Sequence, residues 1–295
     1  MLMKKLLRFA LLAAAAGFGV FWWITTPKVW EDAALAGLSG DPDKCASCHS
    51  AKGSEGEAKL ALVGGREFAS DFGTFYAPNI SQSVEFGIGG WSFSDLANAV
   101  TFGTAPDGKH YYPAFPYTTY QNMTAADMAD LYAYLKTLPA VETPSQPHDV
   151  GFPFNIRRSL GGGKFLFAGK GWALQGDLTP EETRGRYLVE AMGHCAECHT
   201  PRNAIGGLQR DQWLAGGPNP DGKGRIPNIT PHADGIGGWA VVDIVTYLNS
   251  GFTPEYDVAG GQMADVVENT KQLPAEDHAA IAAYLKRIAP VASAE

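Results

Sequence analysis

The stretches Cys45-Ala46-Ser47-Cys48-His49 and Cys195-Ala196-Glu197-Cys198-His199 decide the fold of this 295-residue chain. They use all four of its cysteines, and both have the C-x-x-C-H spacing that attaches a c-type haem. The spacing fits this chemistry because the two thiols add to the two vinyl groups of the haem, while the adjacent histidine ligates the iron. The sequence therefore predicts two covalently attached haems c. The predicted attachment residues are Cys45, Cys48, Cys195 and Cys198, and the predicted proximal ligands are His49 and His199.

Two other kinds of site use the C-x-x-C spacing, namely a redox-active dithiol and one half of a zinc site. Neither chemistry requires a histidine directly after the second cysteine. Here a histidine follows in both copies. The repeated histidine therefore favours haem attachment over a redox dithiol or a zinc site.

The composition is that of an acidic globular protein. A length of 295 residues with 45% hydrophobic content is sufficient for two domains with ordinary cores. The formal net charge of −8, without a long run of Lys or Arg, argues against a nucleic-acid partner, which requires a basic surface. A basic redox protein is the expected kind of partner.

Residues 1–30 have the pattern of an export element. Lys4, Lys5 and Arg8 are followed by residues 9–27, which carry no charge. This stretch approaches the ~20 residues that cross a bilayer and exceeds the ~7–15 residues of a typical signal-peptide core. We therefore expect an uncleaved signal-anchor, a transmembrane helix with its basic end in the cytoplasm and the haem domains on the periplasmic side of the bacterial inner membrane. A cleaved, soluble form is the alternative.

The two halves of the chain repeat three further motifs in the same order, P-N-I-S/T, G-I-G-G-W and A-Y-L-K. These motifs occupy residues 78–81, 87–91 and 133–136 in the first half, and residues 227–230, 235–239 and 283–286 in the second. The repetition indicates a duplicated domain with one haem in each copy.

Four residues of these motifs are candidates for the propionate side of the haems: Asn79, Asn228, Trp91 and Trp239. Asn, Ser and Thr side chains fix turns by hydrogen bonding to the backbone, and near a haem they could also donate to a propionate. The Asn residues lie in formal N-x-S/T sequons, but we do not expect glycosylation in a bacterial exported protein.

Apolar residues recur every three to four positions after each tryptophan, and again before Pro139 and Pro290, which predicts amphipathic helices. Gly103 and Gly251 are placed to end the first helix of each pair. Few segments alternate with period two, so the expected fold is all-α. The expected domains are residues 31–138 and 181–295, joined by a linker, residues 139–180, whose many aromatic residues predict packing on a domain, a membrane surface or a partner.

Methionine is the usual second axial ligand of a low-spin haem c iron, because its thioether raises the potential. Met263 lies in a loop before the last predicted helix, which makes it the expected ligand of the second haem. When the halves are aligned on Trp91 and Trp239 without a gap, Phe115 falls at the position of Met263. Phenylalanine cannot ligate iron.

Three possibilities therefore remain for the first haem. Met123 ligates its iron through a rearranged loop, His110 does so, or the iron is five-coordinate. Alignment on the last helix pairs Met123 with Leu273, where it could instead be a hydrophobic staple beside an N-cap at Thr124. Met123 is the preferred ligand.

The repeated motifs resemble those of the membrane-bound cytochrome c subunits of bacterial periplasmic dehydrogenases of the alcohol and gluconate type. That resemblance implies two tandem class I cytochrome c domains behind the N-terminal helix. The related subunits commonly carry three haem domains and a Met-Pro pair where this chain has Phe115-Pro116. The chain looks closer to a di-haem group of the same superfamily, marked by residues 112–117 and 153–157, in which a methionine at the position of Met123 would replace the missing ligand.

These features favour a membrane-anchored periplasmic di-haem cytochrome c that takes electrons from a dehydrogenase or quinol-oxidising complex and passes them to a terminal oxidase or a soluble carrier. Electron transfer rather than catalysis is the expected role, with no catalytic residue assigned. The alternative is a di-haem redox enzyme, thiosulfate-oxidising or peroxidase-like, with an open or unusual iron at haem 1. The two hypotheses differ in the ligand expected opposite His49.

Overall fold

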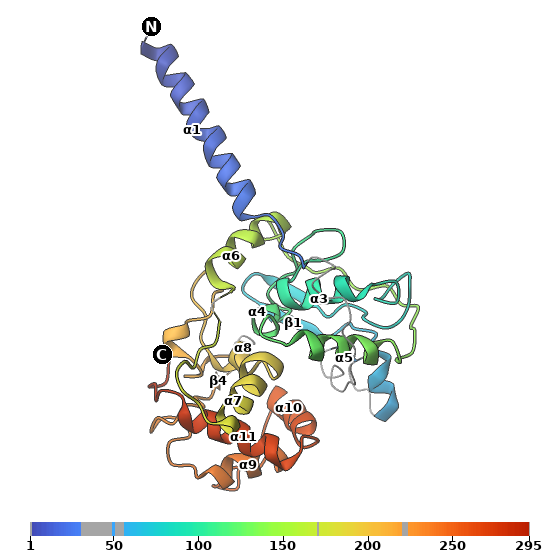
Figure 1. Cartoon of the computed structure of the whole chain (residues 1–295), viewed down its shortest axis with the longest axis vertical. Coiled ribbons are helices and arrows are strands. Elements are labelled where there is room, and N and C mark those ends of the chain that lie inside the picture. Colours follow the sequence, from blue (N-terminus) through green and yellow to red (C-terminus); the bar gives the residue numbers. More distant parts are fainter. Residues whose placement is uncertain (1, 31–48, 51–55, 170, 220–223, 295) are drawn as a thin grey trace.

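The computed structural model describes residues 2–30, 49–50, 56–169, 171–219 and 224–294, and Figure 1 shows that they form a mostly helical body from which one helix projects. The elements of the first half are η2 (Gly56–Ala61), β1 (Glu67–Ser70), β2 (Gly73–Tyr76), α3 (Phe93–Phe102), α4 (Tyr117–Tyr120) and α5 (Ala125–Leu135). Those of the second half are α7 (Pro180–Tyr187), η4 (Leu188–Met192), α8 (Cys195–His199), η5 (Arg210–Gln212), β3 (Gly217–Pro218), β4 (Arg225–Ile226), α9 (Val241–Ser250), α10 (Gln262–Thr270) and α11 (Ala275–Arg287).

Two short antiparallel hairpins, β1 with β2 and β3 with β4, depart from the expected all-α fold. The strands are short, with four residues each in β1 and β2 and two each in β3 and β4, so they give little period-two signal in the sequence. They do not alter the helical class of the body.

The predicted helix ends are confirmed where side chains fix them. Ser92 and Asp95 form a capping box at the start of α3, and Gly103 closes that helix with a left-handed φ of 58°. Gly251 closes α9 in the same way, with a φ of 79°. Thr124 is the N-cap of α5, as predicted, because its hydroxyl accepts from the Asp127 amide.

Each half has its own hydrophobic cluster. The cluster of the first half joins α3 and α5 and includes Leu62, Leu96, Val100, Met128 and Leu135. The cluster of the second half joins η4, α9 and α11 and includes Val189, Leu214, Ile244, Ile281 and Tyr284. The separate clusters agree with a duplicated unit, although the predicted domain boundaries themselves stay a prediction.

The close approach of α7 to α11 in the second half depends on Gly185. A Cβ at this position would lie 1.9 Å from the Ala280 carbonyl oxygen, so any larger residue would push the helices apart. Their packing brings η4, which leads into the second haem motif, against the last helix.

The linker packs on the first half through η3 (Arg157–Ser159) and α6 (Leu160–Phe167). Lys164 on α6 donates to the carbonyls of Phe102 and Gly103, at distances of 2.6 and 2.7 Å, and so covers the end of α3. Gly161 lies against Thr25, just beyond the projecting helix. The linker is therefore packed on the first half, as expected, but two of the aromatic side chains behind that expectation do not take part, since Phe152 is 80% and Phe165 57% exposed.

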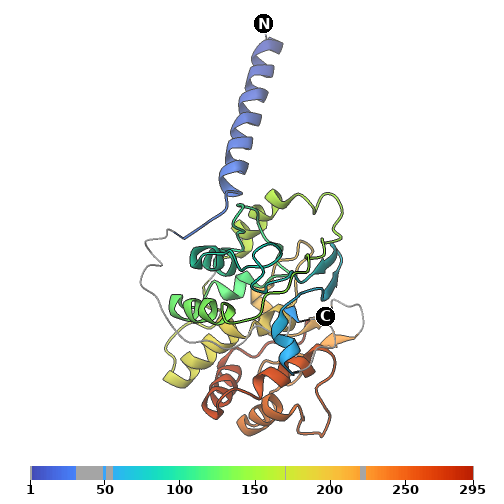
Figure 2. The ribbon, with the colours of Figure 1, turned by 90° about the vertical axis from the view of Figure 1, so that its right-hand side faces the viewer.

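The predicted transmembrane helix is wrong. The projecting helix α1 is Leu2–Ile24, and among the described residues no helix has the length and apolar character that crossing a membrane requires. The helix ends at Ile24, before the end of the uncharged stretch, so only residues 9–24 of that stretch are helical. This part is about 24 Å long, whereas the hydrocarbon core of a bilayer is about 30 Å thick. Thr25 instead turns into the body, where it is fully buried and its hydroxyl accepts from the Arg158 guanidinium at 2.8 Å. Figure 2 shows, from a second side, that α1 itself stands clear of the body.

Candidate functional site

The two predicted proximal histidines have the same hydrogen bond. His49 Nδ1 lies 2.8 Å from the carbonyl oxygen of Pro78, and His199 Nδ1 lies 2.8 Å from that of Pro227. A ring nitrogen beside a carbonyl oxygen must carry the hydrogen, so Nδ1 donates and Nε2 keeps its lone pair. This is the arrangement that orients a histidine for ligation through Nε2.

The electrostatic setting also suits ligation. Burial lowers the pKa of both His49 and His199, although the bond to the proline carbonyl acts in the opposite direction. A lowered pKa keeps the imidazole neutral, and only neutral imidazole binds a metal. The residues present in the second half, two thiols and a neutral imidazole, fit a covalently bound haem.

Cys195 and Cys198 begin and nearly complete α8, one turn apart. Burial raises the pKa of the Cys195 thiol to about 12, with the neighbouring Cys198 as a second cause. A redox-active dithiol needs the opposite shift, toward a thiolate at neutral pH. The observation therefore disfavours a redox dithiol. Cys45 and Cys48 lie outside the described residues.

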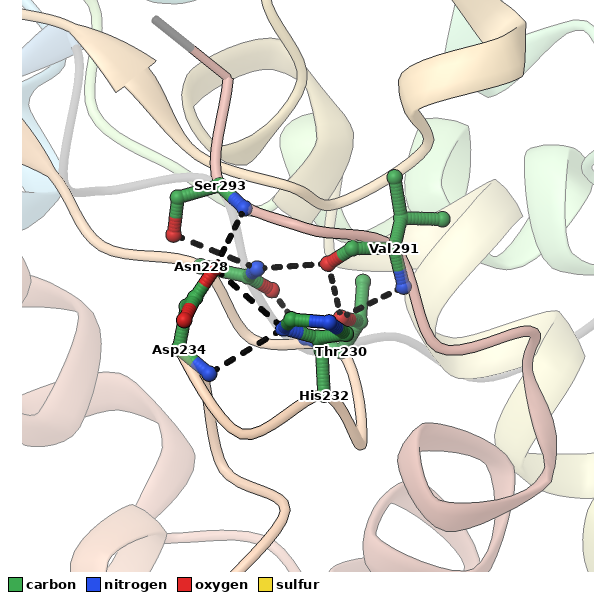
Figure 3. A network of polar contacts seen from close by, with 6 residues as sticks. All are labelled: Asn228, Thr230, His232, Asp234, Val291 and Ser293. Carbon is green, nitrogen blue, oxygen red and sulfur yellow. Dashed lines mark hydrogen bonds and ion pairs between the residues drawn. The ribbon is translucent and has the colours of Figure 1, made fainter.

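The P-N-I-S/T motif holds the end of each half in place, as Figure 3 shows for the second. Asn228 donates from Nδ2 to the Val291 carbonyl at 2.8 Å, and its Oδ1 accepts from the Thr230 amide at 2.8 Å. The Thr230 hydroxyl also donates to the Val291 carbonyl, at 3.0 Å. Since the preceding proline, Pro227, binds His199, the motif ties the C-terminal segment to the predicted haem ligand.

The first half repeats this arrangement. Asn79 donates from Nδ2 to the carbonyls of Val141 and Thr143, both at 2.8 Å, and its Oδ1 accepts from the Ser81 amide at 2.8 Å. Asn79 and Asn228 are both buried. The turn-fixing role considered from the sequence is therefore what these amides perform, while their contact with a haem propionate stays a prediction.

The G-I-G-G-W and A-Y-L-K motifs occur together because the lysine of one binds the loop of the other. Lys286 donates to the carbonyls of Ile236, Gly237 and Trp239 at 3.4, 3.2 and 2.9 Å. In the first half Lys136 donates to the Gly89 carbonyl at 2.8 Å, and Tyr132 donates to that of Trp91 at 2.9 Å. Both motifs are visible in the sequence, but the contact that connects them is not.

Trp91 and Trp239, the two predicted haem-side tryptophans, are placed equivalently. Each packs partly buried against the hydrophobic cluster of its own half. Each backbone amide donates to the isoleucine of its motif, Ile88 or Ile236, at 3.0 and 3.1 Å. Their role toward the propionates stays a prediction.

The gap-free alignment of Phe115 with Met263 has a structural counterpart. The Tyr111 amide donates to Gly103, and the Ala259 amide to Gly251, at 2.7 and 2.8 Å. The Phe115 amide donates to the Tyr112 carbonyl at 3.0 Å, and the Met263 amide donates to the Gly260 carbonyl at 3.2 Å. Phe115 thus corresponds to Met263, which is the second residue of α10 and lies in this helix rather than in the expected loop.

Met123 occupies the position of Leu273, as the alignment on the last helix suggested. The Met123 amide donates to Tyr120, and the Leu273 amide to Thr270, both at 2.9 Å. Both side chains pack against the cluster of their half. Phe115 packs against the same cluster as Met123.

His110, the alternative ligand, has both ring nitrogens engaged elsewhere. Its Nε2 lies 3.0 Å from the Thr25 carbonyl, and its Nδ1 lies 3.0 Å from the Lys164 ammonium. Burial lowers the pKa of His110, and the Lys164 and Arg158 charges lower it further against the bond to Thr25. The neutral ring is a packing residue under α6, which leaves Met123 as the better candidate.

Glu190 is a buried carboxylate beside the second haem motif that no sequence pattern predicted. Glu190 accepts from the Leu174 amide at 3.1 Å, from the Ala173 amide at 2.5 Å and from the Tyr284 hydroxyl at 2.7 Å. Trp213 donates to the same hydroxyl at 3.0 Å, and burial raises the pKa of Tyr284. A glutamate on a mostly apolar segment gave no signal that it pairs with distant residues.

The two halves meet where the distal segment of the first touches the haem attachment helix of the second. The Thr118 and Thr119 hydroxyls donate to Glu197 Oε1 at 3.0 and 3.1 Å. The Tyr120 ring lies edge-on to the His194 ring, with centroids 6.0 Å apart. Residues 118–123, which end in the predicted haem 1 ligand, therefore contact the residues that flank Cys195.

Comparison with known proteins bears on this arrangement. The "Cytochrome c" family model matches residues 41–139. A "Diheme cytochrome c-type" protein of Cereibacter sphaeroides is 53% identical over 291 residues, which cover 96% of both chains. The "Fructose dehydrogenase cytochrome subunit" of Gluconobacter japonicus is 38% identical over 249 residues, 83% of this chain and 50% of the relative.

A third relative has the same character. The "Gluconate 2-dehydrogenase cytochrome c subunit" of Pantoea cypripedii is 35% identical over 255 residues, 83% of this chain and 56% of the relative. The chain spans about half the length of these two dehydrogenase subunits.

Proposed function

Because the chain belongs to the cytochrome c family as a di-haem member with two covalently bound haems c, we propose that it relays electrons between two other redox proteins. The chain is related to the cytochrome subunits of dehydrogenases. A dehydrogenase or a quinol-oxidising complex is the proposed donor, and a terminal oxidase or a soluble carrier is the proposed acceptor.

One observation supports the relay above all others. The distal segment of haem 1, residues 118–123, contacts the attachment helix of haem 2 through Glu197 and His194. The haems supply reversible one-electron chemistry at iron. A direct packing contact between the two binding sites is what sequential transfer through one chain needs.

The residues of each half divide the remaining work. His49 and His199 are held by proline carbonyls with the ring nitrogen Nε2 directed to ligation. Met263 and Met123 are the proposed distal ligands, delivered from different positions of the repeat. Because the two proposed distal ligands come from different positions of the repeat, the chain has a means of setting two different potentials.

We place the protein on the periplasmic side of the bacterial inner membrane. The basic residues at the start of the chain and the uncharged stretch after them support this location, because this is the composition of an export element.

Three relatives are named as cytochrome subunits of fructose, alcohol and gluconate dehydrogenases. The donor of this chain is proposed to belong to that class of enzyme.

Electron delivery by such an enzyme tests the proposal. The oxidised protein is mixed with a quinone-dependent alcohol or gluconate dehydrogenase and its substrate, and haem reduction is followed by stopped-flow absorbance. We expect both haems to be reduced, and then to be reoxidised by a soluble cytochrome. Sustained turnover of thiosulfate or peroxide by the protein alone, with no reduction by a dehydrogenase, would establish the enzymatic alternative instead.

A further inference from the structure

The loop that follows α9 in the second half has the backbone of the loop that follows α3 in the first. Phe252 and Val258 form an isolated antiparallel bridge, as Thr104 and His110 do in the first half. The Thr253 amide donates to Asp257 at 2.9 Å, and the Ala105 amide to Lys109 at the same distance. The two loops, residues 104–110 and 252–258, therefore correspond position by position.

The first of these loops is covered by other parts of the chain. The Thr104 hydroxyl donates to the Lys28 carbonyl at 3.0 Å, and His110 is held between Thr25 and Lys164. Thr104 is 1% exposed and His110 is 3% exposed. A short segment after α1 and the lysine-bearing helix α6 thus seal this loop.

The second loop carries apolar side chains in the same places and leaves them in solvent. Phe252, at the position of Thr104, is 50% exposed, and Val258, at the position of His110, is 59% exposed. Residues directly opposite each other in a bridge direct their side chains to the same face. At the two bridge positions, therefore, the first loop has buried polar residues and the second has exposed apolar ones.

The tip of the second loop is the strongest observation. Tyr256 has a φ of 64° and is 89% exposed, whereas the matching residue of the first loop is Gly108, with a φ of 78°. A left-handed backbone is natural for glycine and unfavourable for tyrosine. The second half therefore holds an aromatic ring at the loop tip against its backbone preference, and such retained strain points to a function.

The charges of the two loops also differ. The first pairs Lys109 with Asp107 at 2.6 Å, so that its tip is neutral. The second has Glu255 and Asp257 at these positions, and both are exposed. An apolar centre of Phe252, Tyr256 and Val258 thus has an acidic edge, in a chain of net charge −8.

From these differences we infer that Phe252, Tyr256 and Val258, with Glu255 and Asp257 beside them, form the docking surface for a basic redox protein that exchanges electrons at haem 2. Apolar groups clustered on a surface and edged by charges mark protein contacts. The loop leads within a few residues to Met263, the proposed ligand of haem 2. A partner with an apolar patch and lysines would cover it as α6 and Lys164 cover the loop of the first half. This inference rests on the proposed electron-transfer function and specifies where one partner binds.

A lysine-rich, mitochondrial-type cytochrome c is a suitable probe, and its acetylated form, which lacks most lysine charges, is the matched control. The reduced holoprotein is mixed with the ferric probe, and one electron passes from protein to probe for each molecule oxidised. We expect transfer to be faster with the basic probe than with the acetylated one, and to slow as salt is added. Binding at low salt is measured in parallel by calorimetry.

Two variants restore the first-half residues at this loop. Tyr256→Gly removes the ring and relieves the left-handed backbone, so the fold is retained, and Asp257→Lys recreates a charge pair like that of Asp107 and Lys109. Each should lower the second-order rate, and the affinity, by about tenfold. Ile205→Ser removes another exposed apolar residue, 67% exposed, from a different loop of the same half and should leave the rate and the affinity unchanged.

Other outcomes overturn the inference. Rates and affinities equal to wild type in both loop variants would remove the loop as the docking surface. Equal rates with the lysine-rich and the acetylated probe would contradict a basic partner. If Tyr256→Gly lost binding to anionic lipid vesicles but kept its rate with the basic probe, the loop would instead be a membrane-binding surface. Reoxidation by ferricyanide separates the docking surface from the electron-transfer function. If ferricyanide cannot reoxidise the reduced protein, the electron-transfer function is rejected. If it can, and the loop variants behave as wild type, only the docking surface is rejected.

Discussion

At the scale of single residues, the difference between the two distal ligands is the feature that distinguishes the halves. Phe115 has the backbone position of Met263, and Met123 has that of Leu273. Changing Met123 to Leu, the residue of the second half, should make haem 1 high-spin and able to bind carbon monoxide when reduced. Leu keeps the volume and packing of the position, so the loss is one of ligation.

Magnetic circular dichroism and carbon monoxide difference spectra measure this change. Met263→Leu is the matched variant and should have the same effect on haem 2. Phe115→Leu, at a residue that packs against the same hydrophobic cluster as Met123, should leave haem 1 low-spin. A Met123→Leu protein with an unchanged spectrum would show that another residue ligates this iron.

His110 predicts how stability depends on pH. Burial lowers the pKa of His110, so below about pH 6.5 the unfolded chain binds a proton that the folded chain does not. The free energy of unfolding should therefore decrease as the pH falls below that value. In His110→Gln, which cannot be protonated, this decrease should be smaller.

Urea unfolding at several pH values between about 5 and 7.5 checks the prediction. Thr104→Val, which loses a hydrogen bond to Lys28 from the same covered loop, should lower stability by a similar amount at every pH. An identical pH dependence in wild type and His110→Gln would exclude the histidine as the cause.

How far the sequence predicted these residues depends on whether their partners are local. The haem motifs and the Thr124 cap were visible because spacing within a few residues defines them, and Phe115 in place of methionine was visible because the two halves align without a gap. The hydrogen bonds between His49 and Pro78 and between Tyr284 and Glu190 join residues that are far apart in the chain. No local sequence pattern therefore predicted either contact. Lys164, whose pKa burial lowers to about 7, was invisible for the same reason.

At the scale of elements, the repeated motifs are parts of one device in each half. The asparagine of the first motif binds the C-terminal segment, and the lysine of the third binds the loop of the second. The sequence predicted the helices and their glycine stops, because periodicity and caps are local. It did not predict the two hairpins, nor that the helix at the N-terminus would end at Ile24 and turn Thr25 into the body.

The lysines of the A-Y-L-K motif should differ in importance. Lys286 binds three carbonyls of its loop, whereas Lys136 binds one. Lys286→Met should therefore lower the free energy of unfolding by about 2 kcal/mol, and Lys136→Met by about 1 kcal/mol. Urea unfolding of the two variants gives the comparison, and an equal or reversed order would contradict the assigned contacts.

At the scale of the whole molecule, the contact between the halves supports the relay. Glu197 accepts hydrogen bonds from two hydroxyls of the first half and forms an ion pair with Arg202. Its side chain is only 11% exposed. Glu197→Ala should release residues 118–123 and speed their amide hydrogen exchange by roughly 10- to 100-fold. Glu197→Gln, which still accepts hydrogen bonds, should change the exchange rate little. Equal exchange rates in Glu197→Ala and wild-type protein would show that this contact does not hold residues 118–123.

The central claim is that one chain holds two six-coordinate haems of different potential and moves electrons between them. A potentiometric titration of the purified holoprotein, followed by its visible spectrum, tests that claim most directly. We predict two reversible one-electron steps at distinct potentials, each with the spectrum of a low-spin haem c. A single step for the whole chain, or one haem that remains high-spin throughout, would contradict it.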